Sequence, residues 1–177
     1  MKKTHCYCGS QVAFSDCCLP FINRSRKPAT AEQLMRSRFS AFCTHNGDYL
    51  FATHHEHYRT GLTAENLTLS AKQTTWVNLD VVSHNNLGEQ VSNVHFKAWF
   101  IEDGYLRCME ENSRFTCSDG QWFYCEPMAL TEKALKPNLL RLNTSEQPLK
   151  ENLKLTRNSP CPCDSGQKYK RCCLSVK

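Results

Sequence analysis

The chain has 177 residues, 40% of them hydrophobic and 22% charged, and a formal net charge of +5 at pH 7. This composition is that of a soluble globular protein, and the length fits one domain of roughly 100–150 residues with terminal extensions. No apolar run approaches the ~20 residues that a membrane span needs. The opening MKKTHCYCGS lacks the apolar stretch of a secretory signal. We therefore expect a cytoplasmic protein without membrane insertion.

The chain carries the same cysteine pattern near both ends. Residues 6–18, CYCGSQVAFSDCC, and residues 161–173, CPCDSGQKYKRCC, both read C-x-C-x8-C-C with a serine at the same offset. Eight of the 12 cysteines lie in these repeats: Cys6, Cys8, Cys17, Cys18, Cys161, Cys163, Cys172 and Cys173. The other four are Cys43, Cys108, Cys117 and Cys125. Scattered cysteines of this kind are expected to fill the core as small apolar side chains.

Helices are predicted directly after the first repeat. Residues 30–33 (Thr-Ala-Glu-Gln) fit a capping box that opens a helix through about residue 43. Residues 46–47 (Asn-Gly) break that helix, and Asp48 is expected to cap a second, short one. A third helical stretch is predicted near residues 63–72.

The hydrophobic period then changes from that of a helix to that of a strand. One half-buried strand is predicted from alternating Val77, Leu79 and Val81, followed by a turn at residues 85–88. A second strand presents one apolar face made of Val94, Phe96, Ala98 and Phe100. Asp-Gly dipeptides at 103–104 and 119–120 are hairpin signals that require positive φ. They delimit further strands at about 105–117 and 121–126.

The two repeats have the spacing of metal ligands. Disulfides do not persist in a reducing cytosol, whereas zinc takes four thiolates in a tetrahedron at ~2.3 Å. We therefore predict two zinc ions, one for each repeat. Four protein ligands close the coordination sphere, so the sites are expected to be structural, and the formal charge falls to about +1 with both ions bound. The alternative is a disulfide framework that includes bonds between neighbouring cysteines.

Together these elements predict an α+β protein. We expect a curved antiparallel sheet packed on about three helices, with a short zinc module at each end. The predicted boundaries are an N-terminal module at 1–27, a central domain at 28–128, a partly helical connector at 129–156 and a C-terminal module at 157–177.

The sequence resembles two known patterns. CPCDSGQKYKRCC is similar to the SEC-C motif, named for the zinc-binding C-terminus of the translocase ATPase SecA, where the module contacts a secretion chaperone and the ribosome. The middle resembles bacterial YchJ-like proteins, in which SEC-C motifs flank a nuclear-transport-factor-like, cystatin-like cone domain. The matching stretches are LMRSRFSAF (34–42), the region of Thr53 and His55, residues 76–79, EENSRF (110–115) and residues 119–124. The resemblance implies a fold and metal sites rather than a reaction.

The chain departs from that family pattern at three places. Gln11 stands where the motif usually has glycine, and the family's Thr-Trp-His-Pro reads Thr-His-His-Glu at 53–56. The family's His-Glu reads Glu-Glu at 110–111. These replacements argue against any catalytic scheme that needs the lost side chains, and we assign no catalytic residue.

A cone-shaped fold encloses a space between sheet and helices where ligands bind. The residues expected to line it are Arg38, His55, Trp76, Glu111, Ser113, Phe115 and Trp122. A His–Glu pair there could perform acid–base chemistry, and Arg38 could hold an anionic group. The alternative is that Arg38 and Glu111 form a buried ion pair while His55 caps a helix. The histidines at 54, 55 and 57 are expected to be solvated rather than to bind metal.

The two repeats differ in what they carry between their ligands. The first has an apolar Val-Ala-Phe run at 12–14 and is expected to pack against the domain, whereas the second displays Lys168, Lys170 and Arg171. We therefore predict a zinc-binding adaptor that binds a protein partner through its C-terminal module, near the secretion or translation machinery if the resemblance holds. The alternatives are a small-molecule binding protein or enzyme that uses the cone, and ribosome or RNA proximity. Aromatic residues for base stacking are nearly absent from the basic segments.

Overall fold

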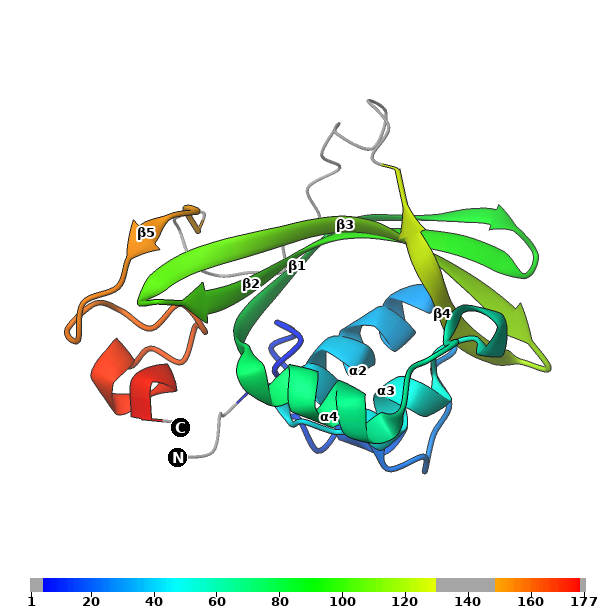
Figure 1. The fold of residues 1–177 in the computed structure, drawn as a ribbon, viewed down its shortest axis with the longest axis horizontal. Coiled ribbons are helices and arrows are strands. Elements are labelled where there is room, and N and C mark those ends of the chain that lie inside the picture. The colour runs from blue at the N-terminus through cyan, green and yellow to red at the C-terminus, as the bar shows by residue number, and fades with distance from the viewer. Residues whose placement is uncertain (1–4, 130–148, 176–177) are drawn as a thin grey trace.

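The computed structural model describes residues 5–129 and 149–175. The main strands form an antiparallel meander in sequence order: β1 (Thr75–Gly88), β2 (Val91–Glu102), β3 (Tyr105–Ser118) and β4 (Gln121–Met128). This curved sheet arches over α2 (Ala31–Cys43), α3 (Gly47–Ala52) and α4 (Ala64–Gln73), which lie on one side of it (Figure 1). The predicted α+β class is confirmed. Within these residue ranges, no helix is long and apolar enough to cross a membrane.

The helices begin at polar caps, with one correction to the sequence-based prediction. Thr30 accepts a hydrogen bond from the Gln33 backbone N–H at 3.2 Å, as the capping box requires. The second cap was predicted wrongly: the Asn46 side chain, not that of Asp48, accepts from the Tyr49 N–H at 2.9 Å. Asn46 lies one position before the helix, so its side chain reaches the free N–H groups of the first turn, whereas Asp48 is already inside it.

Two of the three predicted hairpin turns are confirmed. Residues 103–104 have φ values of 50° and 77°, and residues 119–120 have 51° and 69°, which is the backbone of a type I′ turn. The prediction of a turn at residues 85–88 was wrong, because β1 continues to Gly88 and the chain reverses at 89–90. Asn and Gly at 85–88 are tolerated there since the last residues of β1 are exposed.

The sheet carries a hydrophobic cluster on each face. The larger one lies under the arch, where Val94, Phe96 and Ala98 of β2 pack against Leu34 and Phe39 of α2. The predicted single apolar face of β1 was wrong: Leu79 belongs to this cluster, but Val77 packs on the other side with Trp99. A register shift between Trp76 and Asn78 explains the difference, because a β-bulge reverses the alternation of side chains.

The second cluster joins the C-terminal segment to the sheet. Strand β5 (Leu153–Lys154) pairs with the start of β3, a pairing that the sequence did not predict. Two short 3-10 helices follow, η2 (Tyr169–Arg171) and η3 (Cys173–Ser175). They lie at one end of the sheet, drawn orange to red in Figure 1. Most of the predicted connector, residues 130–148, falls outside the described residues.

Candidate metal centres

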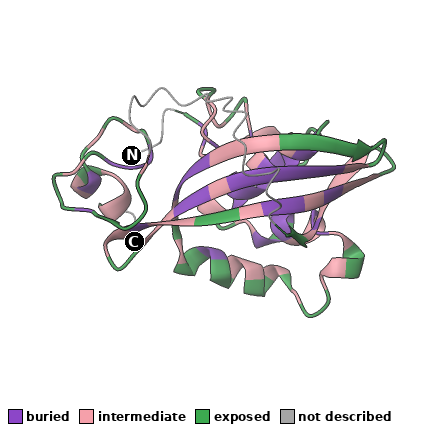
Figure 2. Cartoon of the chain, turned by 90° about the horizontal axis from the view of Figure 1, so that it is seen from above, coloured by how far each residue is buried: buried purple, intermediate pink, exposed green. Residues whose placement is uncertain are grey.

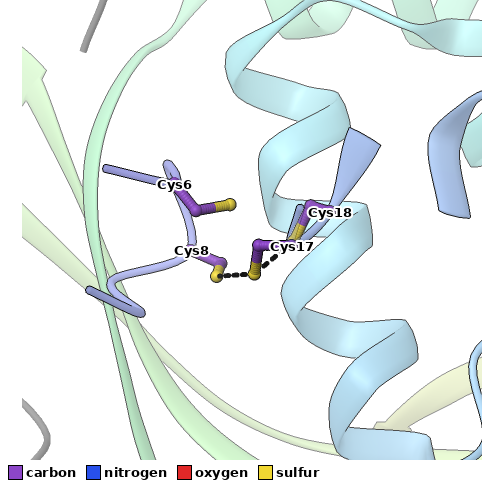
Figure 3. A group of neighbouring side chains, drawn as sticks. All are labelled: Cys6, Cys8, Cys17 and Cys18. Carbon is purple, nitrogen blue, oxygen red and sulfur yellow. Dashed lines mark hydrogen bonds between the residues drawn. The ribbon is translucent and has the colours of Figure 1, made fainter. Parts of the chain in front are cut away.

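The four cysteines of the first repeat converge beneath the sheet. Their sulfur atoms all lie within 4.8 Å of one another, and Figure 3 shows the side chains pointing to a common centre beside α2. The distance from Cys17 Sγ to Cys8 Sγ is 3.7 Å, and that to Cys18 Sγ is 3.8 Å. Cys6, Cys8 and Cys18 are part of the main hydrophobic cluster. This centre is therefore continuous with the core of the domain.

Local structure brings these four ligands together. The positive φ of Gly9 (81°) turns the chain after Cys8, and Cys17–Cys18 lead directly into the short helix α1 (Leu19–Ile22). Arg36 of α2 donates a hydrogen bond to the Cys8 carbonyl oxygen at 3.0 Å and pairs with Glu32 at 2.8 Å. The domain thus holds the ligand loop by side-chain contacts as well as by packing.

The four cysteines of the second repeat form a matching centre at the other end of the chain. Their sulfur atoms also lie within 4.8 Å of one another, and Cys163 Sγ is 3.4 Å from both Cys161 Sγ and Cys172 Sγ. An antiparallel β-bridge between Pro160 and Lys168 closes the loop between the two cysteine pairs, and Cys172 directly follows η2. This centre packs in the second cluster, on the side of the sheet away from the helices.

Both centres fit a tetrahedral metal ion. Four sulfurs at ~2.3 Å from a central ion are ~3.8 Å apart, close to the 3.4–3.8 Å observed between hydrogen-bonded pairs. Hydrogen bonds with Cys17 and Cys18 lower the pKa of Cys8 to about 7. Hydrogen bonds with Cys161 and Cys163 raise the pKa of Cys173 far above its usual range. Sulfurs crowded in this way share protons, and all four ionise together only when a cation compensates them.

A serine contacts the third cysteine in each centre. The Ser10 hydroxyl lies 3.0 Å from Cys17 Sγ, and the Ser165 hydroxyl donates to Cys172 Sγ at 3.3 Å. The two serines occupy the same offset in the two repeats. Because a metal-bound sulfur is a thiolate, the hydroxyl must be the donor, which stabilises the ligand and orients it.

We expect Ser165→Ala to weaken metal binding at the C-terminal centre about tenfold without unfolding the module, because a hydrogen bond to a ligand is lost. Competition with a chromophoric chelator measures this affinity. Ser165→Thr keeps the hydroxyl and should retain most of the affinity. Equal losses in the alanine and threonine variants would show that the hydroxyl is not the cause.

The residues predicted to line a cone cavity only partly come together. Ser113 and Glu111 are hydrogen-bonded, and Phe115 is fully buried in the main cluster. Trp76 instead packs among aromatic rings of α2 and β2, and Trp122 donates to the Ala29 carbonyl. An open groove of about 540 Å³ lies elsewhere, between α1 and α3, and contains none of the seven predicted residues.

The alternative to a ligand site was a buried Arg38–Glu111 ion pair with His55 as a helix cap, and it is half right. His55 does cap a helix, since its Nδ1 accepts from the His57 N–H at 3.3 Å ahead of η1 (Glu56–Tyr58). The Arg38–Glu111 ion pair was predicted wrongly, because among the described residues no carboxylate lies within 4.0 Å of Arg38. Arg38 donates instead to the Leu50 carbonyl and to the Thr53 hydroxyl, both at 2.7 Å.

Two residues beside Arg38 and Glu111, namely His54 and Tyr124, were not predicted from the sequence. The His54 ring lies edge-on to the Tyr124 ring with 5.0 Å between centroids, and the Tyr124 hydroxyl donates to Glu111 at 3.3 Å. Alternation along β4 could have placed Tyr124 on the same face as Trp122. Nothing in the sequence distinguishes His54 from His55, whose side chain points elsewhere.

Comparisons with known proteins agree with both parts of this architecture. The family model for the YchJ middle NTF2-like domain matches residues 30–127, and that for the SEC-C motif matches residues 157–175. A SEC-C motif protein from Psychrobacter arcticus has a similar crystal structure, with a TM-score of 0.65, 26% identity and 99% of each chain covered. The solution structure of a SEC-C motif protein from Rhodopseudomonas palustris covers 71% of this chain and 98% of its own, with a TM-score of 0.66 and 28% identity.

Relatives are similar over nearly the whole sequence. A UPF0225 protein of Shewanella sp. (strain MR-4) is 35% identical over 178 residues, 96% of each chain. Another from Serratia proteamaculans (strain 568) is 37% identical over 171 residues, 95% of this chain and 96% of its own. The match to the SEC-C model covers the second repeat, whereas the candidate metal centre of the first repeat is indicated by the geometry of its four cysteines. The chain thus belongs to the UPF0225 family, with a YchJ-like, NTF2-like middle domain and a C-terminal SEC-C motif.

Proposed function

We propose that this protein is a cytoplasmic zinc-bound adaptor. Each four-cysteine centre holds one zinc ion, and the C-terminal SEC-C module binds a protein partner through its basic surface. Four thiolates in a tetrahedron suit zinc, which needs no redox partner and no open position in a structural site. By analogy with the translocase module named above, the partner belongs to the secretion or translation machinery.

The observation that carries the partner proposal is the exposed charge on the C-terminal module. Lys168 and Arg171 are exposed and Lys170 is half-buried, and among the described residues none of the three has a carboxylate within 4.0 Å. The Lys170 N–H donates to the Arg157 carbonyl at 3.0 Å, so the exposed Arg157 lies next to them. An unpaired cluster of one sign attracts a partner surface of the opposite sign.

Reversing the three charges (Lys168→Glu, Lys170→Glu and Arg171→Glu) should abolish co-purification of the native partner while leaving the fold intact. The matched control is the exposed basic segment after α1 (Arg24→Glu, Arg26→Glu and Lys27→Glu), which makes the same change in net charge. Tagged full-length proteins are compared at low and moderate salt, and bound proteins are identified by mass spectrometry.

Loss of one partner in the C-terminal variant alone would support the adaptor proposal. Equal losses in both variants would indicate non-specific attraction by net charge. Binding that disappears after ribonuclease treatment, with a steep dependence on salt, would favour RNA or ribosome contact instead.

A further inference from the structure

A buried polar cluster lies under β3 and β4, separate from both metal centres. Its centre is the Tyr124 ring, with the Arg38 guanidinium carbon 4.8 Å from the ring centroid and Glu111 hydrogen-bonded to the hydroxyl. Both residues therefore contact Tyr124, yet among the described residues they form no ion pair with each other within 4.0 Å. Opposite charges this close in a weakly polar interior normally pair directly, because the attraction is poorly screened there.

The Arg38 guanidinium has hydrogen-bond donors that the described residues do not use. Arg38 is only 5% exposed, and its two hydrogen bonds to the described residues both use Nη1 and go to neutral oxygens. Its Nε and Nη2 atoms have no acceptor among the described residues. Burial lowers the pKa of Arg38 to about 10, and the charges of Tyr124, Tyr49 and Glu111 offset only part of that effect. The Nε and Nη2 atoms are not among the buried polar atoms that lack a partner, so solvent reaches them, and a carboxylate in place of that solvent would accept charge-assisted hydrogen bonds.

Glu111, which contacts the hydroxyl of the same ring, also has an acceptor that is not used. Within the part of the chain that the structure describes, only its Oε1 atom accepts hydrogen bonds, from the Ser113 and Tyr124 hydroxyls. Met109, two residues earlier on the same face of β3, is 38% exposed, so solvent reaches this face of the sheet beside Glu111. Glu111 is itself half-buried rather than sealed.

A third residue of the cluster, His54, has one ring nitrogen without a hydrogen-bond partner among the described residues. The residue is 8% exposed and its side chain forms a hydrogen bond with the Cys125 backbone, whereas Nε2 has no partner in residues 5–129 and 149–175. Burial, followed by the charge of Arg38, lowers the pKa of His54 to about 4, so the ring is neutral at physiological pH. Unsatisfied buried polar atoms are rare in folded proteins and mark places where a water or a ligand belongs.

We propose that this cluster binds a small molecule that carries both a carboxylate and an amino group, of the α-amino acid type. The carboxylate occupies the free donors of Arg38, and the ammonium group binds the free oxygen of Glu111. The cluster has no net charge, so a simple anion would be repelled by Glu111 and a simple cation by Arg38. A molecule with both charges satisfies each side and supplies the charge contacts that Arg38 and Glu111 do not make with each other. This site is independent of the adaptor role.

Three small probes test this directly. Glycine carries both charges, acetate carries only the negative charge, and methylammonium carries only the positive charge. Each is titrated into the full-length, metal-loaded protein by calorimetry and by NMR of the Arg38 Nε–Hε group. We expect glycine to give a saturable shift of that resonance and to bind more tightly than either single-charge probe. Equal binding of acetate and glycine would refute the role of Glu111, and no saturable shift with glycine would refute the site.

Two glutamates provide a matched pair of variants. Glu111→Gln keeps the shape and removes the charge, and it should weaken glycine binding about tenfold because a charge-assisted hydrogen bond is lost. Glu110→Gln, on the opposite face of β3 beside His95 and Lys97, should leave binding unchanged. Equal weakening in both variants would place the ligand elsewhere. Neither test depends on partner binding by the C-terminal module, so the two proposals fail separately.

Discussion

Replacing Cys8 by serine will destabilise the central domain as a whole, and not only the loop that carries it. Cys8 is fully buried, and Cys6, Cys8 and Cys18 share one hydrophobic cluster with Leu34 and Phe39 of α2. Without one of the four ligands the metal binds weakly, and the folded state loses much of the free energy that metal binding contributes. The remaining buried sulfurs are then left without a counter-charge. We expect a loss of roughly 3–5 kcal/mol, which lowers Tm by about 10–15 °C in a chain of this size.

Calorimetry gives the melting temperature, and native mass spectrometry before and after a strong chelator gives the metal content. The wild type should bind two zinc ions, and Cys8→Ser should bind one. Cys117→Ser changes a cysteine outside both centres and is the matched control, expected to shift Tm little. A Cys8→Ser variant that loses its metal but melts like the wild type would show that the domain core does not depend on this centre.

Replacing Trp99 by alanine will release the C-terminal module from the sheet. Trp99 is 5% exposed, and its indole N–H donates to Asp80 at 2.7 Å. It lies in the second cluster with Leu106 of β3 and with Tyr169 of the module. Removing the ring deletes the largest side chain of this contact, and we expect the docked state to lose about 3–5 kcal/mol.

Hydrogen exchange distinguishes undocking from unfolding. In Trp99→Ala the amides of β5 and of β3 residues 105–106 should lose protection, while the part of the sheet that packs on the helices stays protected and both metal ions remain bound. Trp99→Phe keeps most of the apolar contact but not the bond to Asp80, so it should be milder. Loss of the C-terminal metal in the alanine variant would mean that the module depends on docking for its own fold.

The sequence by itself determined the features that depend on local chemistry. The spacing of the cysteines predicted both four-cysteine clusters, because residues close in sequence are brought together by a short loop whatever the surrounding fold. The Asp-Gly pairs at 103–104 and 119–120 identified two hairpins because few other residues accept positive φ at both positions. The cap at Thr30 and the apolar face of β2 followed from equally local rules.

The tertiary structure decided which side chains meet across the fold. The bulge near Val77 reverses the faces of β1, and no local signal in the sequence marked it. The choice of His54 over His55, the Tyr124 ring beside Arg38 and the pairing of β5 with β3 all join elements that are distant in sequence. Such contacts depend on strand register and helix placement, which the packing of the whole core sets, and a local pattern carries no information about them.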